Sequence, residues 1–79
     1  QYDYIYIDGS HEGDDIYYDA TQSFKILNIN GIMIFDDIAI LSPKVRLQPF
    51  NAFDRFYKKN KKNIKILYLK RLAIIKKIS

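Results

Sequence analysis

The chain of 79 residues contains no cysteine and no tryptophan, and only three glycines and two prolines. Without cysteine it can form neither a disulfide framework nor a thiolate metal site, and this absence fits the cytoplasmic location that we expect. No apolar run approaches the roughly 18 residues that a membrane-spanning helix requires, so we expect no membrane span. The first residues have no basic flank and no cleavage site, which argues against a signal peptide.

Acidic residues are missing from the last part of the chain, because residues 55–79 contain ten basic residues and no acid. Residues 1–54 contain all nine acids and three bases. Two interpretations are open: a polyanion-binding tail beside an acidic site, or a basic surface that is only solvated. The Lys-, Ile- and Asn-rich composition favours the solvated surface, so we do not expect a nucleic acid as a partner.

Hydrophobic residues make up 48% of the chain and aromatic residues 15%, which excludes a disordered tail. A chain of this length forms one domain at most, residues 1–79, with no second domain. The sequence does not start with Met, and its first residues already follow a strand pattern. We therefore expect the later part of a longer domain.

Two short segments, residues 4–8 and residues 32–35, consist almost entirely of β-branched, aromatic and other apolar residues. That composition predicts strands buried on both faces, as in a parallel sheet. Between them an apolar stripe at helical spacing predicts an amphipathic helix over residues 14–28, which Asn30-Gly31 should end. The stripe is formed by Ile16, Ala20, Phe24 and Leu27.

After a loop, aromatic residues spaced three apart predict a second helix over residues 50–59. Residues 64–69 and 72–78 predict two strands, joined by Lys70-Arg71 as an antiparallel hairpin. The element order is therefore β-α-β-α-β-β. We expect an α/β fold with a four-stranded, mostly parallel sheet whose last strand is antiparallel.

Three carboxylates follow the two predicted parallel strands: Asp8 ends the first, and Asp36 and Asp37 end the second. Because adjacent parallel strands lie about 4.8 Å apart and end at the same edge, we expect these side chains to meet there. Crowded carboxylates repel one another unless a cation neutralises them, and oxygen ligands suit Mg²⁺ or Ca²⁺. The alternative is that the aspartates only cap turns and accept hydrogen bonds from loop amides.

His11, the only histidine, follows Asp8 by three residues on the loop at this edge. Because histidine titrates near neutral pH, it suits the role of general base, and we name His11 as the candidate catalytic residue. The alternative is an ordinary surface or hydrogen-bonded histidine. The sequence contains no Gly-rich phosphate loop, no Ser-His-Asp order and no zinc-ligand spacing.

The segments "DGSH" and "FDD" lie within residues 2–38, which resemble class I S-adenosylmethionine-dependent methyltransferases with D-G-x-H after strand four and D-D after strand five. The resemblance implies the carboxyl-terminal half, strands four to seven, of a Rossmann-like methyltransferase sheet. In the related metal-dependent O-methyltransferases an acid and an acid-amide pair bind a divalent metal, which implies Asp8, Asp36 and Asp37 as ligands, with Asp37 replacing the amide. The catechol type has a basic lysine at the position of His11, so a base is implied there although the residue differs.

The resemblance further implies S-adenosylmethionine as cofactor, with Asp8 and Gly9 on the cofactor side, and a small-molecule methyl acceptor. The family builds its cofactor site mainly on a Gly-rich loop after strand one and an acid after strand two, and neither is present in these 79 residues. We therefore expect a methyltransferase portion that is inactive alone. The alternative is a non-catalytic module that binds an anionic partner through the basic hairpin, or a second copy of the chain through an exposed sheet edge.

Overall fold

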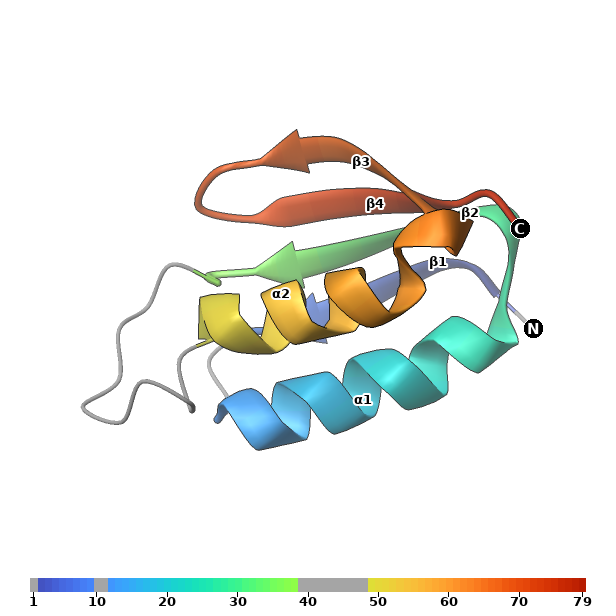
Figure 1. The fold of residues 1–79 in the computed structure, drawn as a ribbon. Helices are drawn as coiled ribbons and strands as arrows, with labels where there is room; N and C mark the ends of the chain where they lie inside the picture. Colours follow the sequence, from blue (N-terminus) through green and yellow to red (C-terminus); the bar gives the residue numbers. More distant parts are fainter. Residues whose placement is uncertain (1, 10–11, 39–48) are drawn as a thin grey trace.

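The computed structural model describes residues 2–9, 12–38 and 49–79, and Figure 1 shows how their elements are arranged. The predicted order β-α-β-α-β-β is confirmed. In chain order the elements are β1 (Tyr2–Asp8), α1 (Gly13–Ile26), β2 (Leu27–Asp36), α2 (Pro49–Asn60), the 3-10 helix η2 (Lys61–Asn63), β3 (Ile64–Leu69) and β4 (Ala73–Lys77).

The sheet is mixed, with the strand order β1-β2-β4-β3. β1 and β2 are parallel, whereas β4 is antiparallel to both of its neighbours, β2 and β3. The α/β class, the hairpin and its antiparallel last strand are therefore confirmed. β1, β2 and β3 run in the same direction and β4 opposes them, so the expected mostly parallel strand direction is confirmed. Because β4 lies between β2 and β3, the described strands nevertheless form a single parallel pair.

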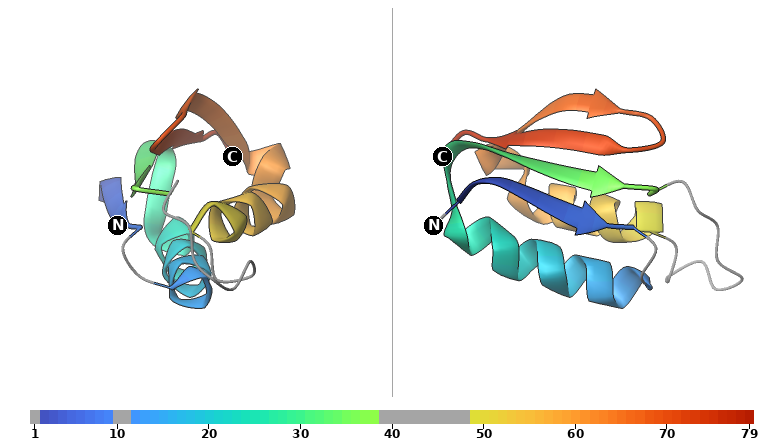
Figure 2. Two further views of the ribbon diagram at one scale, coloured as in Figure 1. Left: turned by 90° about the vertical axis from the view of Figure 1, so that its left-hand side faces the viewer. Right: turned by 180° about the vertical axis from the view of Figure 1, so that it is seen from behind.

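Both helices cover the same face of the sheet, as Figures 1 and 2 show, and the core lies between them and that face. The ring centroid of Phe35 on β2 lies 5.0 Å from that of Phe53 and 5.5 Å from that of Phe56, both on α2. Phe24 on α1 contacts Phe56 edge-on at 5.4 Å. Aromatic rings thus join the sheet to α2 and the two helices to each other, each pair adding about 0.5–1.5 kcal/mol beyond the area it buries. The stripe predicted for α1 is buried at Ile16, Ala20, Phe24 and Leu27.

The opposite face of the sheet is covered by neither described helix (Figure 2). Tyr2, Tyr4 and Tyr6 on β1 are each more than half exposed, whereas Ile7 is buried. The expectation that this strand is buried on both faces is therefore wrong. Successive side chains of a strand point to opposite faces, so only one face of β1 contacts the helices. Tyrosine is tolerated on the solvent-exposed face because its ring carries a polar hydroxyl group.

The junction between α1 and β2 also differs from the prediction. The helix ends at Ile26 and the strand begins at Leu27, so the helix is shorter than residues 14–28 and the strand is longer than residues 32–35. The reason is that pairing with β1 extends to this region and competes with the helical pattern. The predicted turn is present inside β2 as an irregularity, where Asn30 has a φ of 72°, a conformation that asparagine adopts more readily than most residues.

Lys77 on β4 caps the carboxyl end of α1 from a distant part of the chain. Its Nζ donates hydrogen bonds to the carbonyl oxygens of Phe24, at 2.7 Å, and Leu27, at 2.9 Å, and lies 4.6 Å from the centre of the Phe24 ring. The last carbonyl groups of a helix have no partner within the helix and carry partial negative charge. The ammonium group therefore stabilises the end of α1 and fixes β4 to it.

Candidate functional site

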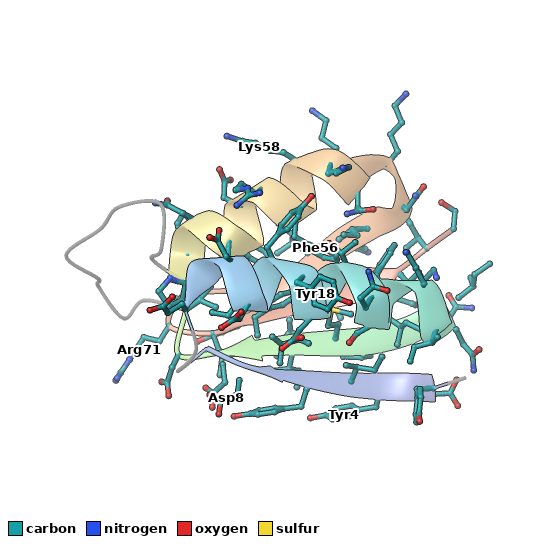
Figure 3. The ribbon with its side chains drawn as sticks, turned by 90° about the horizontal axis from the view of Figure 1, so that it is seen from below. Tyr4, Asp8, Tyr18, Phe56, Lys58 and Arg71 are labelled. Atoms are coloured by element: carbon teal, nitrogen blue, oxygen red, sulfur yellow. The ribbon has the colours of Figure 1, made fainter. Side chains whose placement is uncertain are left out.

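Asp8 and Asp36 end the two parallel strands side by side. They are register partners in the β1–β2 ladder, so their side chains project from the same face of the sheet. Asp8 is exposed and Asp36 is half-buried, and Figure 3 shows Asp8 at the end of its strand. The prediction that these two carboxylates lie at the same edge on adjacent strands is confirmed.

Tyr6 belongs to this site, although the sequence analysis did not single it out. It precedes Asp8 by two positions, so both residues lie on the same face of β1. Its hydroxyl donates a hydrogen bond to Oδ2 of Asp36. This hydrogen bond is the main reason that the pKa of Tyr6 rises from 10.0 to about 12; desolvation and the negative charges of Asp36, Asp8 and Asp37 act in the same direction. The alternation of side chains along a strand was the signal that could have identified it.

Asp37 follows β2 in the left-handed conformation, with a φ of 51°. Aspartate is among the residues that adopt this conformation most readily. The N–H of Asp37 donates a hydrogen bond to Oδ1 of Asp36 at 2.9 Å. Both carboxylate oxygens of Asp36 therefore accept a hydrogen bond, which agrees with the alternative that an aspartate here stabilises a turn.

Gly9 packs the turn after β1 against the end of β2. A Cβ atom on Gly9 would lie 1.8 Å from the carbonyl oxygen of Asp36, and 3.0 Å from the carbonyl carbons of Asp36 and Asp37. These are backbone atoms, so a side chain at Gly9 would require the strand itself to shift. Glycine is thus needed at this position for steric reasons, and the role of Gly9 beside a cofactor stays a prediction.

The predicted metal ligands are brought together only in part. Within residues 2–9, 12–38 and 49–79, no group of three or more histidine, cysteine, aspartate or glutamate residues could hold a metal ion. Asp8 and Asp36 form an adjacent pair, and Mg²⁺ is commonly bound by only one or two carboxylates while it keeps several waters. The pair fits that type of site, and the Tyr6 hydroxyl would compete with the metal ion for the carboxylate of Asp36. His11, the predicted base, lies outside the described residues.

A cavity of about 400 Å³ opens beside Asp36, which ends β2, and Asp37, which follows it. Its other side is the turn between β3 and β4, which the N–H of Ile38 holds in place by donating to the carbonyl oxygen of Arg71 at 3.1 Å. Figure 3 shows Arg71 at the same end of the molecule as Asp8. The carboxyl edge therefore combines acidic and basic side chains around one space. The residues that line it are Asp36, Asp37, Tyr68, Lys70, Arg71 and Leu72.

Among the described helices, none is long and apolar enough to cross a membrane. Comparisons with protein families, with curated proteins and with solved structures find no match to this chain. Its function is therefore inferred from the fold and from the geometry of the carboxyl edge.

Proposed function

We propose that this chain is the carboxyl-terminal portion of an S-adenosylmethionine-dependent methyltransferase, of the divalent-metal-assisted O-methyltransferase type. The observation that carries the proposal is the pairing of Asp8 with Asp36 at the carboxyl ends of β1 and β2. Open α/β sheets bind ligands outside the carboxyl ends of their parallel strands. The sequence resemblance assigns metal ligands to the same two positions.

The order and direction of the elements support the proposal. The element order β-α-β-α-β-β, with a last strand antiparallel to its neighbours, agrees with the closing half of the methyltransferase sheet that the resemblance implies. In this proposal β1 and β2 correspond to strands four and five, and the hairpin of β3 and β4 corresponds to strands six and seven.

Each residue at the carboxyl edge then has a role. Asp8 and Asp36 would hold a divalent cation, Mg²⁺ or Ca²⁺, and the N–H of Asp37 would orient the Asp36 carboxylate. The bound cation supplies Lewis acidity, which lowers the pKa of a hydroxyl group on the methyl acceptor. His11 takes the proton from that hydroxyl as general base. The cavity beside Asp36 and Asp37 gives the acceptor room at this edge of the sheet.

The residues present do not make a complete cofactor site. Methyl transfer needs the sulfonium carbon held in line with the attacking oxygen at roughly 3 Å, and the family's Gly-rich loop and strand-two acid, which hold the cofactor, are not in this sequence. We therefore expect no micromolar binding of S-adenosylmethionine and no methyl transfer by these residues alone. A longer protein that also contains the Gly-rich loop and the strand-two acid should bind S-adenosylmethionine and transfer its methyl group. Calorimetric titration of the chain with the cofactor checks the first point, and micromolar binding would contradict it.

Thermal unfolding in the presence of Mg²⁺ or Ca²⁺ tests the metal site. At about five times its Kd, a metal that binds only the folded chain should raise the melting temperature by about 4–8 °C. We expect the double variant Asp8→Asn with Asp36→Asn to lose this rise. Asp15→Asn with Asp19→Asn is the control, because it removes the same charge from exposed positions on α1. The absence of a rise in the wild type, or an equal loss in both double variants, would refute the site.

A basic cavity favours a second candidate function, a module that binds an anionic partner. The end of α2, where this cavity lies, is at the opposite end of the molecule from the carboxyl ends of β1 and β2 (Figure 1). The cavity measures about 360 Å³ and lies at the end of α2 and along η2, rather than on the hairpin that the sequence suggested. Lys58 pairs with Asp54 at 2.9 Å, but neighbouring lysines are exposed. The lining residues are Lys58, Lys59, Asn60, Lys61, Lys62 and Asn63.

Those lysines also lie where cations stabilise the carboxyl end of a helix, so they have a structural role without any ligand. Titration with inorganic polyphosphate separates the two explanations. Salt-dependent binding that is lost in Lys61→Gln with Lys62→Gln would favour the anion-binding module. Binding that is too weak to detect, together with a metal-dependent rise in melting temperature, would favour the methyltransferase portion.

A further inference from the structure

We propose that the cavity between the end of β2 and the β3–β4 turn binds a methyl acceptor that carries both a carboxylate and a hydroxyl group. That the ligand is a methyl acceptor rests on the proposed function. The chemical groups of the ligand are inferred from the residues that line the cavity. Basic side chains line one side of the cavity and aspartates line the other. Its volume of about 400 Å³ lies within the roughly 300–1,000 Å³ of small-molecule sites.

Hydrogen bonds hold the two sides of the cavity in place. The N–H of Ile38 donates a hydrogen bond to the carbonyl oxygen of Arg71 at 3.1 Å. Within the turn, the N–H of Lys70 donates a hydrogen bond to the carbonyl oxygen of Leu72 at 3.0 Å. Across the cavity the carboxylate of Asp36 accepts two hydrogen bonds, which fix its orientation. The backbone of the turn and the Asp36 carboxylate are therefore fixed before a ligand binds, so ordering them adds little to the entropy that binding costs.

Lys70 and Arg71 are available to bind an anionic group. Both residues are exposed, and neither forms an ion pair with another residue of the described ranges. A guanidinium group binds a carboxylate through two parallel hydrogen bonds. A phosphate would bring additional negative charge towards Asp36 and Asp37 and would be repelled more strongly. A singly charged carboxylate is therefore the better ligand.

The opposite side of the cavity offers hydrogen-bond acceptors to a ligand. Ionised carboxylates such as those of Asp36 and Asp37 accept hydrogen bonds but donate none, so a ligand hydroxyl satisfies them and a second acid group does not. A hydroxyl at this position also lies beside the pair formed by Asp8 with Asp36. Tyr68 and Leu72 complete the lining of the cavity, so the part of the ligand that joins carboxylate and hydroxyl is apolar.

Calorimetric titration of the 79-residue chain with three related probes tests the proposal. We expect 3-hydroxybenzoate to bind most tightly, because it carries both groups. The uncharged 3-hydroxybenzamide should bind about tenfold more weakly, and benzoate, which lacks the hydroxyl, about fivefold more weakly. Equal affinities for the acid and the amide would overturn the proposal. Tighter binding of 3-hydroxyphenyl phosphate would overturn the choice of a carboxylate.

Two charge-matched variants show whether the cavity is responsible. Lys70→Gln with Arg71→Gln should weaken the binding of 3-hydroxybenzoate about tenfold and leave that of the amide unchanged. Lys25→Gln with Lys65→Gln removes the same charge from exposed positions outside both cavities and should bind like the wild type. Because the chain has a formal net charge of +4, equal losses in both variants would mean that the affinity reflects overall charge, which overturns the proposal.

The outcome can be separated from that of the proposed function. Selective binding of 3-hydroxybenzoate without a metal-dependent rise in melting temperature would support the carboxylate cavity and refute the metal-assisted reaction. A metal-dependent rise without any preference for the acid over the amide would refute the cavity proposal and leave the metal site in place.

Discussion

The Tyr6 hydroxyl donates a hydrogen bond to the Asp36 carboxylate across the parallel pair β1–β2. The bond orients Asp36 and makes Tyr6 harder to ionise, since its pKa is raised from 10.0 to about 12. Because the pKa of Tyr6 is higher in the folded chain than in the unfolded chain, the folded chain binds the Tyr6 proton more tightly. The resulting stability is fully present below pH 10.0 and is lost as the pH rises through about 12.

Replacement of Tyr6 by phenylalanine should remove this pH-dependent stability. We expect Tyr6→Phe to be less stable than the wild type at neutral pH, and the difference to shrink as the pH rises from 10.0 towards about 12. Urea unfolding followed by circular dichroism at a series of pH values measures it. Tyr4→Phe is the control, because Tyr4 is similarly exposed on the same face of β1. An equal pH dependence in the two variants would contradict the assignment.

Replacement of Lys77 by methionine should lower the free energy of unfolding by about 1–3 kcal/mol, because it leaves two carbonyl groups of the α1 end without their charged donor. Lys76→Met is the matched control. Lys76 lies directly opposite Lys65 in the β3–β4 ladder, so its removal relieves a like-charge contact and should be neutral or slightly stabilising. Chemical denaturation compares the two variants, and equal stabilities would show that the cap contributes nothing.

Replacement of Gly9 by alanine should destabilise the chain by about 1–3 kcal/mol, because the added methyl group overlaps the carbonyl oxygen of Asp36. Thermal unfolding measures the loss. Glu12→Ala is the control, since Glu12 is exposed and its side chain makes no capping hydrogen bond, and we expect a change within about 0.5 kcal/mol. A Gly9→Ala variant as stable as the control would contradict the close approach of the two strand ends.

Local sequence patterns predicted most of the fold, because helix and strand periodicities depend on neighbouring residues. The buried positions of α1 followed from their spacing alone. Leu27 shows the limit of that reasoning: it is buried as the stripe predicted, but it begins β2, because pairing with β1 overrides the helical pattern. The exposure of Tyr4 could not be predicted from composition, because it depends on both helices packing on one face of the sheet.

The part of the candidate site that depends only on strand direction could be predicted from the sequence. Asp8 and Asp36 meet because parallel strands end at one edge. The approach of Lys70 and Arg71 to that edge could not be predicted, because it requires β4 to lie next to β2 in the sheet. That pairing joins residues far apart in the sequence, and no local pattern encodes it. The role of Gly9 likewise depends on a contact with the backbone of another strand.

The position of β4 between β2 and β3 imposes an order on folding. β3 pairs only with β4 among the described strands, so it can join the sheet only together with β4 or after it. Docking of this hairpin on β2 brings together distant parts of the chain, and such non-local steps are the slow ones in folding. Until it occurs, α1 lacks the ammonium group of Lys77, and the carboxyl edge lacks the side formed by Arg71. The helix and the site are therefore completed in the same step.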